Sequence, residues 1–285
     1  MPQYFYDLTN VKIQLHTPFR LQIGTESLPF LTEGTAACQI HIVFTATDCL
    51  PDLPENGCWI EDRYYGILDG MQCVFVRNSR DSVPYAALIE TSTGFTCQYL
   101  AEFERFFLDS SDLLNLLGLE NILLSQGSIL LHASLIQWQG RGIVFSAPCG
   151  TGKSTQASLW EKYLNSDILN GDRTGLRCVD GRWVAYGMPF AGTSGIYRKE
   201  SAAVSAIVVL SQGPENRIRR LQPMDAVKKL LPECSCRRWD RDFMDRMLST
   251  LLALVGQIPV YHLECRPDQD AVLLLRDTII EDEGK

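Results

Sequence analysis

The segment from Ser146 to Thr155 constrains the fold of this chain more than any other. It reads Ser-Ala-Pro-Cys-Gly-Thr-Gly-Lys-Ser-Thr and matches the phosphate-loop pattern Gly-x4-Gly-Lys-Ser/Thr, except that Ala147 stands at the first glycine. An apolar strand, Arg141–Ser146, precedes the loop, and a helix without proline or glycine, Lys153–Leu164, follows it. A strand, a glycine-rich loop and a helix in this order predict an α/β domain that binds the phosphates of a nucleotide.

Each residue type in this loop has a physical role in holding phosphate. Glycines at 150 and 152 allow positive φ angles, so that successive backbone N–H groups turn toward the ligand. The Lys153 ammonium is expected to neutralise the β- and γ-phosphates, and the Ser154 hydroxyl is expected to ligate Mg²⁺. The predicted cofactors are therefore ATP and Mg²⁺. The predicted nucleotide-binding residues are Cys149, Gly150, Thr151, Gly152, Lys153, Ser154 and Thr155.

Hydrophobic patterning divides the chain into a β-rich N-terminal domain, residues 1–107, and an α/β domain, residues 108–285. In the first, strands are predicted at Val11–Leu15, Ala37–Phe44, Tyr64–Leu68, Gln72–Arg77 and Ala86–Glu90. In the second, a helix is expected to begin near Ser110, and further helices at 153–164, 223–230 and 241–255. The strands predicted there are 128–136, 141–146, 167–170, 175–178, 183–186, 205–210, 260–264 and 271–275.

Two residues near the loop are candidates for the chemistry of phosphoryl transfer. Asp172 ends the apolar stretch that begins at Asp167, and it is the candidate Mg²⁺ ligand, general base, or both. His132 lies in the strand just before the loop strand, where it can reach the phosphates. The alternatives are an ordinary turn aspartate and a core histidine. His16, His41 and His262 are expected to be structural.

A glycine-, serine- and threonine-rich segment, Pro189–Lys199, ends in the cations Arg198 and Lys199. Such a loop is expected to fold over the γ-phosphate, where Arg198 would stabilise charge in the transition state. The alternative is a surface turn with solvated charges.

Composition limits the partners and the compartment. A net charge of −8 argues against a nucleic-acid partner, because binding a phosphate backbone needs a basic face. No apolar run reaches the roughly 20 residues that span a bilayer, so no membrane segment is expected. Residues 1–8 have neither the basic nor the apolar region of a secretory signal. Ten scattered cysteines predict buried free thiols. Together these features predict a cytoplasmic protein.

Several of these motifs together resemble the HPr kinase/phosphorylase-related branch of the phosphoenolpyruvate-carboxykinase-like kinases. The resemblance runs from about residue 110 to about 280 and is closest to stand-alone peptide serine kinases, such as lasso-peptide kinases. The matching segments, besides the loop, are 131–134 (Leu-His-Ala-Ser), 170–173 (Asn-Gly-Asp-Arg), 187–193 (Gly-Met-Pro-Phe-Ala-Gly-Thr), 206–210 (Ala-Ile-Val-Val-Leu), 214–218 (Pro-Glu-Asn-Arg-Ile) and 259–263 (Pro-Val-Tyr-His-Leu).

The resemblance implies an HPr-kinase-like α/β domain with a mixed sheet, and a kinase that moves the γ-phosphate of ATP to a hydroxyl of a peptide or small protein. The acceptor would be a serine, as in the maturation of peptide natural products, and the N-terminal domain would bind it. The implied catalytic residues are Asp172, His132, Lys153 and Arg198, and the implied Mg²⁺ ligands are Ser154 and Asp172.

The sequence departs from the family at two positions besides lacking the C-terminal signature of HPr kinases. Gly171-Asp172 stands where two adjacent acids are common, and Ala147 replaces a glycine. A nucleotide-dependent sensor without transferase activity and a bifunctional HPr kinase/phosphorylase therefore stay open as alternatives, as does a homo-oligomer.

Overall fold

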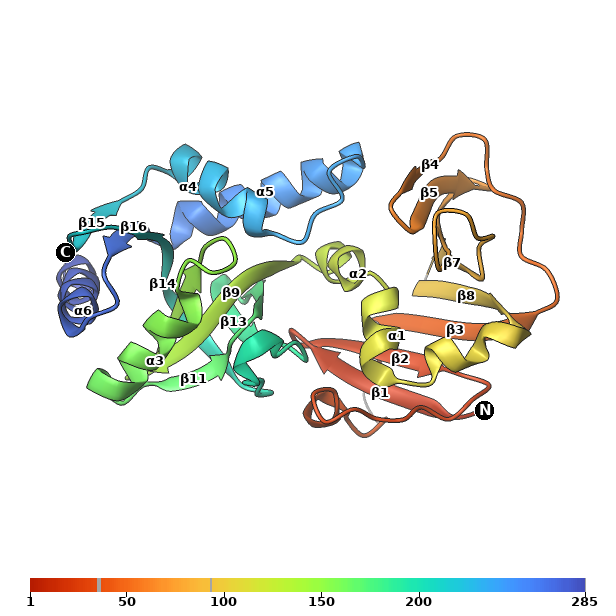
Figure 1. The fold of residues 1–285 in the computed structure, drawn as a ribbon, viewed down its shortest axis with the longest axis horizontal. Coiled ribbons are helices and arrows are strands. Elements are labelled where there is room, and N and C mark those ends of the chain that lie inside the picture. Colours follow the sequence, from red (N-terminus) through yellow and green to blue (C-terminus); the bar gives the residue numbers. More distant parts are fainter. Residues whose placement is uncertain (35–36, 93, 285) are drawn as a thin grey trace. The chain divides into compact units, whose positions relative to one another are not determined.

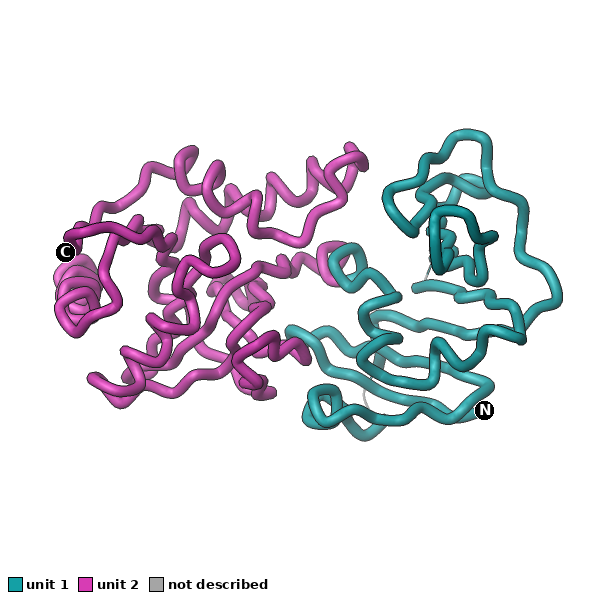
Figure 2. Tube along the Cα trace, in the orientation of Figure 1, with its two compact units in different colours: residues 1–122 teal, residues 123–285 magenta. Residues whose placement is uncertain are grey.

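The computed structural model describes residues 1–34, 37–92 and 94–284. These form two compact units, Met1–Ile122 and Leu123–Lys285 (Figure 2). The boundary thus falls at 122/123 rather than at the expected 107/108. Residues 108–122, expected in the second domain, pack with the first unit.

The first unit is built on one mixed sheet. Its described residues form eight strands in the order β1-β2-β3-β8-β7-β6-β5-β4, in which β2–β3 and β3–β8 pair in parallel (Figure 1). The strands are β1 Gln3–Leu8, β2 Val11–His16, β3 Ile40–Thr47, β4 Cys58–Ile60, β5 Arg63–Leu68, β6 Met71–Val76, β7 Ala86–Thr91 and β8 Gly94–Leu100. The helical segments are η1 Leu28–Phe30, η2 Ala101–Phe107, α1 Ser110–Leu116 and α2 Leu119–Ser125, the last of which leads into the second unit.

The second unit contains a mixed sheet in which two long strands change partners along their length. Strand β9 pairs with β12 through residues 128–132, with β10 through residues 133–138 and with β11 through residues 135–137. Strand β14 pairs with β13, and then in parallel with β10 and β16. The strands are β9 Ser128–Trp138, β10 Arg141–Ser146, β11 Asp167–Asn170, β12 Arg173–Val179, β13 Arg182–Gly187, β14 Ser201–Gln212, β15 Arg217–Arg220 and β16 Val260–Cys265.

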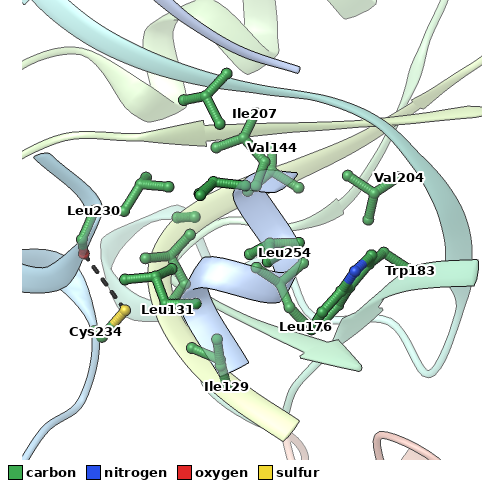
Figure 3. Close-up of a cluster of buried hydrophobic side chains, with 14 of the residues drawn as sticks. Ile129, Leu131, Val144, Leu176, Trp183, Val204, Ile207, Leu230, Cys234 and Leu254 are labelled. Atoms are coloured by element: carbon green, nitrogen blue, oxygen red, sulfur yellow. Dashed lines mark hydrogen bonds between the residues drawn. The ribbon is translucent and has the colours of Figure 1, made fainter. Parts of the chain in front are cut away.

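Helices cover this sheet over two hydrophobic clusters. They are α3 Lys153–Leu164, η3 Gly192–Ser194, α4 Pro223–Leu230, η4 Leu231–Glu233, α5 Arg241–Gln257 and α6 Gln269–Glu283. Helices α4 and α5 bury Leu230 and Leu254 against Leu131, Val144 and Leu176 of the sheet (Figure 3). Helices α3 and α6 cover the second cluster. No helix in the described part of the chain is long and apolar enough to cross a membrane.

The predicted fold class, an α/β unit with a mixed sheet preceded by a β-rich region, is confirmed. The predicted strand Ala271–Leu275 is wrong, because these residues belong to α6. The N-cap Asp268 accepts a hydrogen bond from the Ala271 N–H at 3.0 Å, and Ala271, Leu275 and Ile279 are buried at helical spacing. A short apolar run is compatible with either a strand or a helix, and here the N-cap at Asp268 favours the helix.

All ten cysteines are free thiols, as predicted. Their expected burial is wrong for Cys49, Cys58, Cys149 and Cys178, which are exposed. Of these, only Cys149 lies in the phosphate loop.

Trp160 anchors α3 on the sheet, and its removal tests this packing. Its ring is fully buried and meets Trp138 edge-on at a centroid distance of 5.5 Å. We expect Trp160→Ala to lower the free energy of unfolding by about 3–5 kcal/mol, measured by urea titration, because it leaves a cavity. Leu252→Ala on the exposed face of α5 is the control and should cost less than about 1 kcal/mol. Equal costs would contradict the packing described.

Candidate active site

The loop between β10 and α3 has the backbone form that phosphate binding needs. Gly150 and Gly152 have φ angles of +77° and +118°, and Gly152 is the N-cap of α3. A Cβ added at either glycine would meet no atom within 4 Å, so the loop borders open space. Ala147 has a negative φ and is fully buried in the cluster under α3, so this position does not require glycine.

The Lys153 ammonium is held inside this loop. Its Nζ donates hydrogen bonds to the carbonyl oxygens of Ala147 at 2.8 Å and Pro148 at 3.4 Å, and the residue is 7 % exposed. Burial lowers the pKa of Lys153, and the nearby Glu233, Cys149 and Asp172 act in the opposite sense. A positive charge is thus fixed next to the loop amides before any ligand binds.

Asn170 shapes the turn that presents Asp172. Its side-chain oxygen accepts hydrogen bonds from the N–H groups of Asp172 and Arg173, each at 3.0 Å. Its side-chain nitrogen donates to the Met188 carbonyl oxygen at 2.9 Å, and the residue is fully buried. The turn is also joined to β9, because the Ala133 N–H donates to the Asp172 carbonyl oxygen at 2.9 Å. Asp172 therefore sits on a rigid support.

There is no room for a second acid at position 171. A Cβ on Gly171 would lie 1.8 Å from the Ser194 hydroxyl oxygen, which belongs to η3. The segment 189–199 packs against this turn, since the Gly171 N–H donates to the Ile196 carbonyl oxygen at 3.2 Å. The departure at Gly171 is thus part of the local packing.

Glu233 provides a second carboxylate beside His132. The His132 imidazole lies between two acids, with Nδ1 3.1 Å from Glu233 Oε2 and Nε2 3.7 Å from Asp172 Oδ1. Glu233 comes from η4, and its side chain is 13 % exposed. Sequence reasoning missed Glu233, because 101 residues separate it from His132 and no local pattern marks it.

The two arginines near this turn have different surroundings. Arg198, predicted to be catalytic, lies 3.6 Å from Asp167 and 4.0 Å from Glu200, at the other end of β11 from Asn170. Arg173 Nε instead lies 3.8 Å from Asp172 Oδ2. The geometry brings Lys153, His132 and Asp172 together and makes Arg173 the cation beside Asp172.

The residues predicted to hold Mg²⁺ offer oxygen ligands of the right kind. Ser154 is exposed in the first turn of α3. Both Asp172 oxygens lie 3.7 Å or more from the side chains of His132 and Arg173, beyond hydrogen-bond distance, so their lone pairs can take a hard cation.

Two hollows border the loop, and both include Gly150 and Thr151 in their walls. One, about 590 Å³, extends from Cys149 to Glu233. The other, about 450 Å³, is lined by Thr155 and Gln156 of α3 and by residues after β16. Both fall in the size range of small-molecule sites.

No protein-family model matches the chain, and no curated protein matches it in sequence. Among solved structures, the chain is similar to the HPr(Ser) kinase/phosphatase from Coxiella burnetii. The TM-score is 0.32 and the sequence identity 12 %, over 54 % of this chain and 93 % of that chain. A likeness of this size assigns neither a family nor an activity.

Cys149 allows a chemical test of the loop, because it is exposed and lines the larger hollow. We expect iodoacetamide to label Cys149 and Mg-ATP to slow this labelling at least about tenfold, measured by peptide mass spectrometry, because bound phosphate covers the loop. Cys178, exposed on β12, is the control and should react at the same rate with and without nucleotide. Equal labelling of Cys149 in both conditions would count against nucleotide binding here.

Proposed function

We propose that this chain is an ATP- and Mg²⁺-dependent phosphotransferase that moves the γ-phosphate of ATP to the hydroxyl of a serine in a peptide or small protein. One observation carries the proposal: the buried Lys153 ammonium is held inside a phosphate-type loop by the carbonyl oxygens of Ala147 and Pro148. Burial lowers the pKa of Lys153, and the charges of the nearby Glu233 and Asp172 oppose that shift. Cations that bind phosphate and carboxylates that accept a proton are the groups that phosphoryl transfer requires.

The residues present support each part of the step. The acceptor oxygen forms a bond to the γ-phosphorus, the bond from that phosphorus to the β-bridging oxygen breaks, and ADP leaves. Asp172 takes the proton of the hydroxyl. Ser154 and Asp172 would hold Mg²⁺, which when bound neutralises charge on the phosphates. Arg173, beside Asp172, is placed to stabilise the transferring group.

Glu233 supplies the second carboxylate that the Gly171-Asp172 turn lacks. Its Oε2 accepts a hydrogen bond from His132 Nδ1–H, which fixes the tautomer and leaves Nε2 as the lone-pair nitrogen facing Asp172. His132 then helps Asp172 to hold the proton. Glu233 is a positioning residue, acting through the imidazole.

The smaller hollow is the site proposed for the nucleoside. It begins at Thr155 and Gln156, at the start of α3, where the phosphate chain would leave the loop. The buried side-chain oxygen of Gln156 has no hydrogen-bond partner among the described residues. Gln156 is therefore the polar side chain proposed to face the base, and its amide can turn to present either its oxygen or its nitrogen.

Lys153→Ala tests the phosphate loop. We expect it to weaken Mg-ATP binding by about 10- to 100-fold in calorimetry, because it removes charge-assisted hydrogen bonds to the phosphates. Lys162→Ala, in the last turn of the same helix, should bind as the wild type does. Equal affinity of Lys153→Ala and wild type would rule out the assigned loop.

Asp172→Asn tests transfer separately from binding. It keeps the shape of the side chain and leaves the loop intact, so nucleotide binding should survive, whereas transfer of labelled phosphate to serine peptides should fall at least about 100-fold. Asp180→Asn, in the β12–β13 turn, is the matched control and should retain full activity. Normal turnover of Asp172→Asn would remove its role as base. A wild-type chain that binds Mg-ATP but phosphorylates no peptide would instead favour a nucleotide sensor.

A further inference from the structure

The larger hollow beside the loop has features that nucleotide binding does not use. Its volume is about 590 Å³, and its wall is formed by the loop, by residues of β14 and β16, and by α4 and η4. It is lined by Pro148, Cys149, Gly150, Thr151, Val209, Leu210, Ser211, Gln212, Lys228, Lys229, Pro232, Glu233 and His262. The acid among these described lining residues is Glu233, whose carboxylate faces His132.

Charge is separated along this hollow. Lys228 and Lys229, from the last turn of α4, are exposed and line one part of it. Lys228 Nζ lies 3.9 Å from Asp225 Oδ1, outside the hollow, whereas no ion pair of Lys229 is seen among the described residues. Glu233 lies three residues after the end of α4 and belongs to the cluster with His132 and Asp172. The hollow is therefore cationic at α4, and through Glu233 and His132 it adjoins the proposed catalytic Asp172.

A neutral hydrogen-bonding pair, Ser211 and His262, also lines this hollow. The Ser211 hydroxyl oxygen and His262 Nε2 are 2.9 Å apart and lie on the neighbouring parallel strands β14 and β16. Burial chiefly, and then the charges of Lys229 and Arg219, lower the pKa of His262, while Glu264 acts in the opposite sense. Arg219 lies opposite His262 in β15. Cations from α4 and β15 thus surround a pair that can still donate a hydrogen bond.

We propose that this hollow is the acceptor subsite and that it binds a peptide segment in which a carboxylate side chain lies close to the phosphorylated hydroxyl. The carboxylate is held by Lys229 together with the Ser211–His262 pair, and the hydroxyl lies toward Glu233 and Asp172. This inference rests on the proposed function, because it names the substrate class of the same site.

Charge complementarity carries the choice of an acidic peptide. An uncharged nucleobase would form no charge-assisted hydrogen bonds with the lysine ammonium groups. The phosphates of the nucleotide are already bound, in the proposed complex, by the loop amides and Lys153. An anionic group near Lys229 gains charge-assisted hydrogen bonds and leaves no lysine desolvated without a partner. A basic acceptor would be repelled by the same groups. His262 therefore has a binding role that sequence reasoning, which took it as structural, did not assign.

The test uses the whole chain saturated with Mg-ADP and two fluorescein-labelled ten-residue peptides. Both contain one serine, flanked by aspartate in one peptide and by asparagine in the other. We expect the acidic peptide to bind at least tenfold more tightly by fluorescence anisotropy. Lys229→Met should remove this preference, and Lys229→Glu should reverse it toward a lysine-flanked peptide. The control, Lys162→Met on α3, lies outside the hollow and should keep the wild-type preference.

Three results would overturn the subsite: equal binding of the acidic and asparagine peptides, an unchanged preference in Lys229→Glu, or displacement of the peptide by ADP, which would make the hollow part of the nucleotide site. ADP binding is measured separately by calorimetry, and the peptides are also tested without nucleotide. A chain that binds no ADP but still prefers the acidic peptide would overturn the proposed phosphotransferase and support the anionic subsite. The two failures are therefore distinguishable.

Discussion

The change of partner along strand β9 is the constraint on which the candidate site depends. Up to His132 the strand pairs with β12, and beyond it the strand pairs with β10 and, through Leu135 to Gln137, with β11. The phosphate loop leaves the end of β10, and the Asp172 turn leads into β12. Because the two ladders separate at one point of a buried strand, the loop, the imidazole and the turn meet there. A site formed in this way is held by backbone hydrogen bonds on both sides.

Two buried polar side chains stabilise the geometry of this site. Lys153 bonds to loop carbonyls from inside, and Asn170 joins the Asp172 turn to the segment that follows β13. Each is satisfied within the protein, so little reorganisation is needed when a charged ligand arrives. The same tight packing leaves no space for a side chain at Gly171, and a carboxylate from η4 lies on the other side of His132.

The helices on the two faces of the sheet contribute different residues to the candidate site. Helix α3 carries the loop residues and packs over the cluster around Trp160. Helices α4 and α5 bury their own apolar faces over the other cluster, and α4 and the following η4 place Lys229 and Glu233 along the larger hollow. Hydrophobic burial thus sets the distribution of charge around the loop, with the lysines of α4 and the Glu233 carboxylate lining the same hollow.

Local patterns in the sequence determined the strand–loop–helix unit: β10, α3, β11 and α4 begin and end at the predicted residues. Glycine spacing and one lysine sufficed there, because those interactions lie within a few residues. The strand predicted at Ala271–Leu275 was wrong, since a five-residue apolar run does not distinguish strand from helix. Glu233, His262 and the surroundings of Arg198 were decided only by the tertiary structure. Their partners come from distant parts of the chain, and such pairing depends on how the strands are ordered in the sheet, which no local pattern encodes.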